Sequence, residues 1–400
     1  MVIQLSMMKN NNQQPKKILI FSMSYYPRFV GGAEVALKEI TDRLSEQDFE
    51  FHLVTLRYDS SFLKYEKIGN IHVHRIGFTK KNASFEDLRS FPLRLNKILY
   101  QFWAPCVGLL LHRKLKFEKA WSMMAHSAGV PGNIFSRISH VPLLLTLQEG
   151  DPTDHIEKQM RIFGSFFTGV FTQAKQIQVI SRFLKEWAEQ MGSKVVPEIV
   201  PNGVDTDVFV PGTQARKKEE FRLITTSRLV PKNGVDLVIE AMSQLPENVY
   251  FDIVGDGFQR EMLEKRVQEL GLQKRIIFHG QKEKGDVVNL LQSADVFIRP
   301  SRSEGLGNSF LEAMAIGLPI IGTQVGGIPD FLFDPKTHGD KATGLFCDAE
   351  SSASVAVCVK RLMTDSILYE QLHVNAATLV QEGYTWDIVA TRMGLLIRSL

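Results

Sequence analysis

The feature that most constrains the fold of this 400-residue chain is a regular alternation of short apolar runs with amphipathic segments. The apolar runs predict buried parallel strands, and the amphipathic segments between them predict the helices that connect such strands. In the first half we expect strands at 18–23, 51–55, 71–76, 120–124, 143–147, 176–180 and 198–200, with helices at 33–44 and 182–191. In the second half we expect strands at 222–226, 250–254, 276–279, 296–299 and 319–322, with helices at 235–243, 260–270, 284–292 and 308–316.

The turn sequence Pro-Asn-Gly at 201–203 divides the two sets of strands without a long linker. The chain also exceeds the roughly 250–300 residues at which a single core stops growing. We therefore expect an α/β protein with two Rossmann-like, doubly wound domains, residues 17–203 and 204–384, facing each other across a cleft. Ligands of such sheets bind at the carboxyl ends of the strands, which here means in the cleft. Residues 1–16 are expected to form a disordered leader.

Residues 303–329, SEGLGNSFLEAMAIGLPIIGTQVGGIP, carry the most specific chemical signal. Backbone amides at Gly305 and Gly307, together with the N-terminus of the helix that follows, form a concave positive pole suited to a phosphate. The carboxylates of Glu304 and Glu312 flank that pole. An anion site between two carboxylates suits a ligand with both phosphate and hydroxyl groups, such as a nucleotide sugar.

The same segment resembles the Glu-x7-Glu signature of retaining glycosyltransferases with the GT-B fold, sequence family four, also called glycosyl transferases group 1. Five further segments resemble motifs of that family and follow in the family's order: 24–40, 199–209, 227–241, 251–270 and 294–301. The resemblance implies a retaining transferase that moves a sugar from a nucleotide-diphosphate sugar to a glycan or lipid-linked acceptor. Polysaccharide or glycolipid biosynthesis is the expected setting.

The resemblance also implies a role for each domain. The first would bind the acceptor and the second the nucleotide sugar, and a helix at about 385–400 would cross back to the first domain. Glu312 matches the glutamate that holds the ribose hydroxyls, and Glu304 matches the glutamate that faces the transferred sugar. The donor-binding residues are expected to be Gly32, Arg228, Lys232, Gly305, Leu306, Gly307, Asn308 and Glu312.

Arg228 follows a predicted strand, where a guanidinium can pair bidentately with a diphosphate. Family members usually place a lysine directly before the glycine of this loop; here that position is Asn233, and Lys232 stands one residue earlier. Cleavage of the anomeric C–O bond adds negative charge to the departing diphosphate, which these cations and the helix N-terminus at Asn308 would stabilise. The only Asp-x-Asp sequence, at 205–207, lies between the domains, so we expect no metal and no other cofactor.

The clearest departure from the family lies in the loop 146–151, TLQEGD. Many relatives have a histidine about where Gln148 stands, and a glutamine can hydrogen-bond hydroxyls but cannot carry a proton. We assign Glu304, Gln148 and Asp151 to catalysis. We assign Gly31, His126 and Glu149 to binding of the acceptor.

Two other functions remain compatible with the sequence. Because Gln148 replaces the usual histidine, the chain could be a non-catalytic, nucleotide-sugar-binding partner subunit. A hydrolysing nucleotide-sugar 2-epimerase shares the fold and the cleft, but is not expected to carry both the Glu-x7-Glu segment and the opening GGAE loop. Hydrolysis of the donor without an acceptor separates a transferase from a pure binder.

Composition bears on the compartment and on partners. Three cysteines without a C-x-x-C pair predict a reducing, cytoplasmic compartment. No uninterrupted apolar run reaches the roughly 20 residues that a membrane-spanning helix needs.

Residues 1–203 hold 26 Lys and Arg against 18 Asp and Glu, whereas residues 204–400 hold 21 against 26. We therefore expect the basic half to face an anionic membrane surface, and we expect no nucleic-acid partner.

Residues 75–119 concentrate this basic character and interleave it with aromatic residues. Basic residues near an anionic leaflet contribute about 1 kcal/mol each, so the segment predicts docking at the inner face of a membrane. The alternative is an ordinary crossover helix packed on the sheet, with its charges solvated. The ten basic residues are Arg75, Lys80, Lys81, Arg89, Arg94, Lys97, Arg113, Lys114, Lys116 and Lys119.

Overall fold

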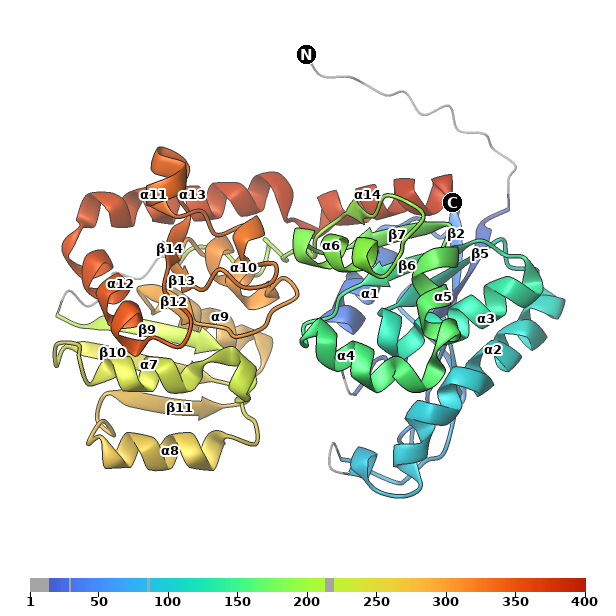
Figure 1. Ribbon diagram of the computed structural model, residues 1–400, viewed down its shortest axis with the longest axis horizontal. Coiled ribbons are helices and arrows are strands. Elements are labelled where there is room, and N and C mark those ends of the chain that lie inside the picture. The colour runs from blue at the N-terminus through green and yellow to red at the C-terminus, as the bar shows by residue number, and fades with distance from the viewer. Residues whose placement is uncertain (1–13, 29, 85–86, 213–218) are drawn as a thin grey trace, which may run out of the picture.

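The structure is a computed structural model that describes residues 14–28, 30–84, 87–212 and 219–400. Each half of the chain contains one β-sheet with helices on both of its faces (Figure 1). The first strand begins at Lys16, and most of the expected disordered leader, residues 1–13, lies outside the described residues.

The first sheet has the strand order β3-β4-β2-β1-β5-β6-β7-β8. Neighbouring strands run parallel except β3, which pairs antiparallel with β4. The sequence did not predict β3, because this edge strand is exposed at alternate residues and has no apolar run. The strands are β1 (Lys16–Phe21), β2 (Phe49–Leu56), β3 (Tyr65–Ile68), β4 (Ile71–Ile76), β5 (Lys119–Met123), β6 (Leu143–Leu147), β7 (Gln176–Val179) and β8 (Glu198–Ile199).

Within the described residues of the first half, six α-helices pack around this sheet. Two of them, α1 and α6, match predicted helices closely, and the others were not predicted individually. A π-helical turn, η3 (Ala125–Gly129), follows β5. The helices are α1 (Gly32–Arg43), α2 (Asn96–Leu115), α3 (Val130–Ser139), α4 (Thr153–Met160), α5 (Ser165–Gln173) and α6 (Arg182–Gln190).

The second sheet is parallel throughout, in the order β11-β10-β9-β12-β13-β14. Its strands are β9 (Phe221–Thr226), β10 (Val249–Val254), β11 (Ile276–Gly280), β12 (Val296–Arg299), β13 (Ile320–Gly322) and β14 (Gly344–Phe346). Its helices are α7 (Val235–Met242), α8 (Arg260–Glu269), α9 (Lys284–Gln292), α10 (Asn308–Ala315), α11 (Pro335–His338), α12 (Ser352–Thr364) and α13 (Ser366–Gly383).

Each sheet has one position where the strand order reverses direction. In the first sheet it lies between β1 and β5, and in the second between β9 and β12. At such a position the loops that leave neighbouring strands diverge to opposite faces, and the crevice between them binds ligands. The fold therefore places the loops after these four strands at the centre of the molecule, where the two halves meet (Figure 1).

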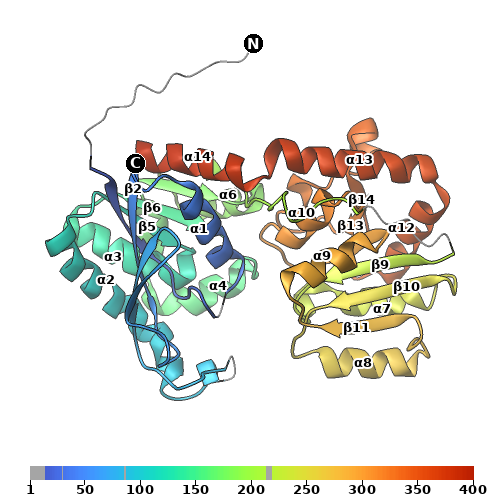
Figure 2. The same ribbon diagram turned by 180° about the vertical axis from the view of Figure 1, so that it is seen from behind.

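The last helix, α14 (Trp386–Ser399), returns to the first half, as Figures 1 and 2 show from opposite sides. Thr385 caps its N-terminus by accepting a hydrogen bond from the backbone N–H of Ile388, 3.4 Å away. Trp386 and Met393 are buried in one apolar cluster with Leu37 of α1. α14 therefore packs on α1, the helix that follows the glycine loop.

Candidate active site

A cavity of about 680 Å³ lies between the carboxyl ends of the two sheets. Loops after β1, β5 and β6 line it from the first half, and loops after β9 and β12 line it from the second half. Twelve of the predicted site residues line the cavity: Gly31, Gly32, His126, Gln148, Asp151, Arg228, Lys232, Glu304, Gly305, Leu306, Gly307 and Asn308. Glu149 and Glu312 do not line it.

The glycines of the loop before α10 allow it to approach the first half closely. A Cβ on Gly305 would lie 2.3 Å from the carbonyl oxygen of Glu149, so no larger residue fits there. Gly307 has a φ of +97°, a left-handed conformation that glycine adopts without strain, and α10 begins directly after it. The start of α10 therefore lies at the wall of the cavity, where Asn308 and Ser309 line it.

Two cations enter the cavity from the loop after β9. Arg228 is exposed, and its guanidinium pairs with no carboxylate in the part of the chain that the structure describes. Asn233, which stands where the family usually has a lysine, is buried and donates a 2.7 Å hydrogen bond to the carbonyl of Arg228. Asn233 therefore supports the turn that carries Arg228.

Lys232 is held by the first half. Its Nζ lies 2.7 Å from the carbonyl oxygen of Gly150 and 2.9 Å from Oδ1 of Asp151. Burial alone would raise the pKa of Asp151, but the Lys232 ammonium outweighs it and keeps that pKa below its ordinary value. This ion pair joins the second half to the loop after β6 of the first half.

The wall opposite α10 is the glycine loop after β1. Gly31 caps α1, and its N–H donates to the carboxylate of Glu34, 2.7 Å away, so Glu34 serves the helix start. A Cβ on Gly32 would lie 3.4 Å from Nδ2 of Asn308. The amides of α1 and those of α10 therefore begin on opposite sides of the same cavity.

The prediction that Glu149 contacts the acceptor is revised. This residue is fully buried, and its Oε1 accepts a 2.6 Å hydrogen bond from the N–H of Ala125 and lies 3.3 Å from Nδ1 of His126. Its Oε2 accepts from the N–H of Gln148, 2.9 Å away. Glu149 joins the η3 turn to the loop after β6, so it positions His126 and Gln148, which do line the cavity.

A polar chain links Gln148 to the second half. Asn202, which is buried in the turn between the halves, donates to Oε1 of Gln148 at 3.2 Å and to Oδ1 of Asn308 at 3.1 Å. The sequence marked Asn202 only as a turn residue. Its side chain fixes the orientation of the Gln148 amide relative to the start of α10.

Glu312 lies on the second turn of α10, beside a smaller cavity of about 200 Å³ that shares Asn308 with the main one. Burial raises the pKa of Glu312 to about 7, although Lys284 and Arg299 favour its ionised form. The assignment of Glu312 to a ribose stays a prediction, and it requires the nucleoside to extend past Asn308.

Sequence reasoning missed Arg299, the last residue of β12. It lines the cavity although the residue is only 6% exposed, and its guanidinium contacts Glu304. The available signal was a charged residue at the end of the apolar strand Val-Phe-Ile-Arg, because strands buried on both faces seldom carry an unpaired charge.

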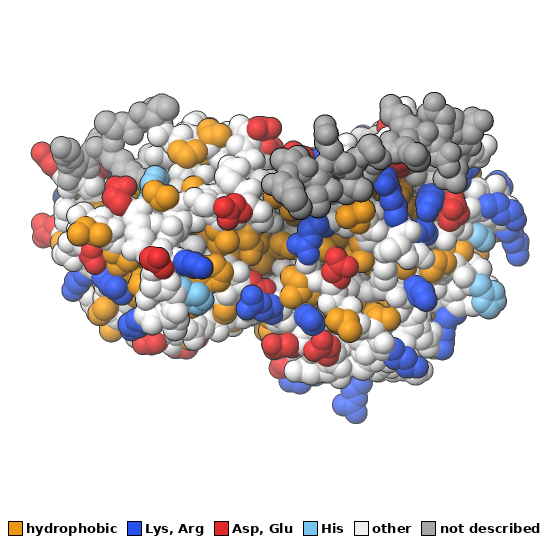
Figure 3. Space-filling view, turned by 90° about the horizontal axis from the view of Figure 1, so that it is seen from above, with side chains coloured by type: hydrophobic (Ala, Val, Ile, Leu, Met, Phe, Trp, Pro, Cys, Tyr) orange, Lys and Arg blue, Asp and Glu red, His pale blue; other side chains and the backbone are white. Residues whose placement is uncertain are grey.

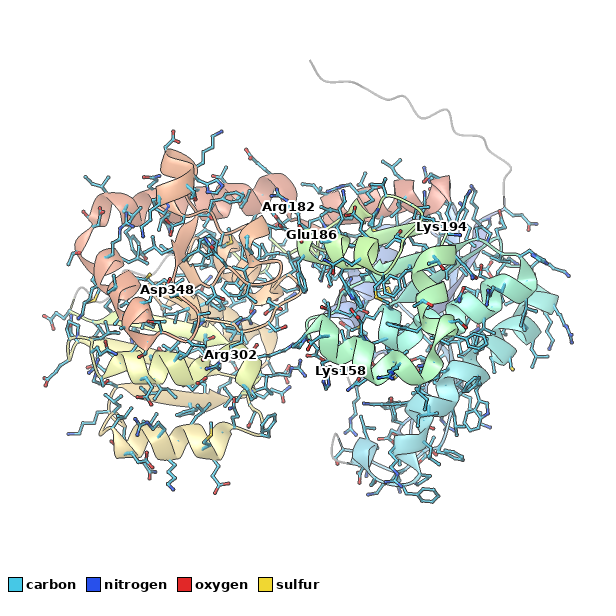
Figure 4. All side chains as sticks on the ribbon, viewed as in Figure 1. Lys158, Arg182, Glu186, Lys194, Arg302 and Asp348 are labelled. Atoms are coloured by element: carbon cyan, nitrogen blue, oxygen red, sulfur yellow. The ribbon has the colours of Figure 1, made fainter. Side chains whose placement is uncertain are left out.

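A further contact between the halves joins α6 to the second half. The backbone N–H of Arg182, at the start of α6, donates to Oδ2 of Asp330 at 2.7 Å. Figure 4 labels Arg182 and Glu186 on α6, where this helix meets the second half.

In Figure 3, Lys and Arg side chains are more numerous over the first half, in agreement with the charge counts of the two halves.

Within the described residues, no group of three or more His, Cys, Asp or Glu side chains is arranged to hold a metal ion. Across the same residues, no helix has both the length and the apolar character that a membrane crossing requires.

The fold and the cavity define a class of architecture: two Rossmann-like domains with a cavity between the carboxyl ends of their sheets. The model of glycosyltransferase family 4 matches residues 30–208, and that of glycosyl transferases group 1 matches residues 211–378. The chain therefore belongs to the group 1 glycosyltransferases of the family 4 type, and it is a transferase enzyme that acts on nucleotide sugars.

Individual relatives agree with this family. An uncharacterized glycosyltransferase of Methanocaldococcus jannaschii is 25% identical over 392 residues, which cover 94% of this chain and 96% of the relative. A GDP-mannose-dependent alpha-(1-6)-phosphatidylinositol monomannoside mannosyltransferase of Mycobacterium tuberculosis is 31% identical over 231 residues, or 53% and 58% of the two chains. The structure of Anabaena HepE in complex with UDP and glucose matches with a TM-score of 0.74 at 19% identity, covering 96% and 100% of the chains. This match confirms the GT-B fold.

Proposed function

We propose that this glycosyltransferase moves a sugar from a nucleotide-diphosphate sugar to a glycan or lipid-linked acceptor, with retention of anomeric configuration and without a metal. The observation that carries the proposal is the cavity, in which Arg228, Lys232 and the start of α10 converge beside Glu304. These groups supply the positive charge that a departing diphosphate needs.

The reaction follows from where charge develops. As the anomeric C–O bond breaks, negative charge grows on the diphosphate, and Arg228, Lys232 and the amides at Asn308 lower the energy of that charge. Recruitment of Lys232 by the diphosphate frees Asp151 to accept a hydrogen bond from an acceptor hydroxyl. Glu304 stabilises the positive charge on the sugar. The acceptor oxygen bonds to the anomeric carbon from the face of the leaving group, its proton passes to the departing phosphate oxygen, and the configuration is retained.

The direct test is a panel of UDP-, GDP- and ADP-sugars, because one relative is GDP-mannose-dependent and HepE was solved with UDP and glucose. We expect one donor to raise the melting temperature and to be hydrolysed slowly without an acceptor, with and without a chelator. Mass spectrometry identifies the product, and NMR of its anomeric proton reports the configuration. An inverted product, loss of activity in the chelator, or binding without any turnover would each contradict the proposal.

A membrane-proximal acceptor is favoured by one face of α2. Ile98, Phe102, Cys106 and Leu110 recur at every fourth residue and are all exposed, which forms an apolar stripe along the helix. The opposite face of α2 packs on the first half, as expected of a crossover helix, so the proposed membrane contact rests on the exposed stripe alone. Figures 1 and 2 show α2 on the outer flank of the first half.

The structure reduces the number of basic residues that could contact a lipid headgroup. Arg75 and Lys119 are buried: Arg75 donates to the carbonyl of Tyr26, and Lys119 donates to that of Arg398. Neither can meet a lipid headgroup. The side chain of Arg89 lies outside the described part of the chain. The exposed basic residues that remain are Lys80, Lys81, Arg94, Lys97, Arg113, Lys114 and Lys116.

We predict that the protein floats with vesicles containing anionic lipid at low salt, and not with neutral vesicles. Each exposed basic residue near an anionic leaflet should contribute about 1 kcal/mol, and the stripe should add apolar insertion. The double variant Phe102→Asp, Leu110→Asp should no longer float, whereas Val357→Asp, at an exposed apolar residue of α12, should behave as the wild type. Failure of the wild type to float on either vesicle would leave a soluble acceptor as the substrate.

A further inference from the structure

Arg299 occupies the position where the second sheet opens toward the cavity. It ends β12, which lies beside β9 at the reversal of strand order. Its side chain is 7% exposed. A guanidinium removed from water in this way costs several kcal/mol unless its donors are paired, so its partners indicate why it is there.

The partners of Arg299 all belong to the loop before α10, to the first turn of that helix, or to the end of β9. Its Nη2 donates to Oε2 of Glu304 at 2.6 Å. Its Nη1 donates to Oγ of Ser309 at 2.6 Å and to the carbonyl of Thr226 at 3.4 Å. Its Cζ lies 4.5 Å from the centroid of the Phe310 ring. One guanidinium therefore connects the sugar-facing carboxylate to the start of the helix that would bind phosphate.

Gly307 makes this arrangement possible. A Cβ at this residue would lie 3.1 Å from Nη2 of Arg299 and 2.7 Å from Cδ2 of Phe310, in a backbone conformation that side chains rarely adopt. The loop can close around the guanidinium only because residue 307 has no side chain.

Stability does not account for Arg299. A buried ion pair is often no better for stability than apolar residues of similar volume. In the part of the chain that the structure describes, Nε of Arg299 is buried without a hydrogen-bond partner, which costs about 1–3 kcal/mol. An apolar residue at the end of β12 would avoid that cost, as Val296, Phe297 and Ile298 do earlier in the strand.

We infer that Arg299 is a positioning residue for the transfer reaction: its buried guanidinium fixes the carboxylate of Glu304 relative to Ser309 and the start of α10. The inference rests on the proposed role of Glu304. With Oε2 bound by Arg299, Glu304 is held in one orientation. Its Oε1 lies on the side of Gly150, where a Cβ on that glycine would be 3.8 Å away.

The first test separates turnover from binding. Arg299→Met should lower kcat by about 100-fold, the scale of losing one preorganised electrostatic contact, and should change the KM for the donor by less than about threefold. Arg299→Lys should recover only part of kcat, because an ammonium keeps the charge but cannot hold two partners in a fixed fork. Arg266→Met, which removes an equally paired guanidinium from the surface of α8, should keep wild-type kcat.

The second test is a double-mutant cycle between Arg299→Met and Glu304→Gln. If Arg299 acts through Glu304, the double variant should be about as slow as the slower single variant, because residues that act as a unit are not additive. Multiplicative losses would overturn the inference, and so would full recovery of kcat in Arg299→Lys. If Arg299→Met does not fold, the cycle is run with Arg299→Lys and read in the same way.

These outcomes separate the inference from the proposed function. If Glu304→Gln is slow but Arg299→Met is as fast as the wild type, the inference about Arg299 fails alone. If Glu304→Gln is as fast as the wild type, the role of Glu304 fails, and the inference fails with it.

Discussion

Replacement of Glu304 by glutamine should reduce kcat by about 100- to 1000-fold, the range found when one preorganised charge is removed from a site where charge develops. Glutamine has nearly the same shape, so the loop before α10 and the contact with Arg299 should persist in altered form. The lost quantity is the negative charge beside the sugar. Nucleotide affinity should stay within about threefold, because the diphosphate is held by Arg228, Lys232 and backbone amides.

The measurement pairs steady-state turnover with calorimetric affinity for the nucleotide on the same preparation. The contrasting variant is Glu312→Ala, which should lose nucleotide affinity because its carboxylate is assigned to the ribose hydroxyls. Since burial raises the pKa of Glu312 to about 7, its charged form is populated above that pH. Wild-type affinity should therefore rise from about pH 6 to pH 8, and Glu312→Gln should lose that dependence. Near-normal turnover in Glu304→Gln would show that its assigned role is wrong.

Replacement of Arg228 by alanine should weaken nucleotide affinity by about 1.5–3 kcal/mol, the range for a hydrogen bond to a charged group. This corresponds to about 10- to 150-fold in Kd. Arg228 is exposed in the cavity and forms no carboxylate ion pair within 4 Å among the described residues, although its charge helps to lower the pKa of Asp151. Lys232, in contrast, must first leave Asp151.

Isothermal titration of the donor nucleotide, with and without a chelator, measures this effect. Arg266→Ala on α8 is the matched control, because it removes an arginine of the same half that does not line the cavity. An unchanged Kd in Arg228→Ala, or binding that requires a divalent cation, would contradict the assignment of the phosphate site.

The sequence alone was sufficient for the elements that depend on local pattern. Strands buried on both faces, such as β6 and β12, are formed mainly by apolar residues, so their positions can be predicted within a few residues. The edge strand β3 is exposed at alternate residues and has no apolar run, so local pattern does not predict it. Its position is set by pairing with β4. Glycines at 305 and 307 were recognisable as well, since a tight loop before a helix needs them wherever it occurs.

Tertiary structure decided which polar groups share an environment. Glu149 and Asp151 are two residues apart and looked equivalent in the sequence, yet one is buried under the loop and the other pairs with Lys232 across the cleft. A carboxylate's role depends on whether neighbouring donors consume it, and those donors come from distant segments. The same reason hid Asn202, whose partners are Gln148 and Asn308.

The order of motifs along the chain was enough to indicate the family, and the alternation of strands and helices was enough to indicate two α/β domains. The arrangement around Glu304 could not be predicted in this way. Arg299 contacts Glu304 and Ser309 only because β12 ends beside β9 and the loop before α10 folds over the guanidinium. Sequence patterns record what a residue contributes to its own strand or helix. The electrostatics of a site between two domains depend on distances that only the folded chain sets.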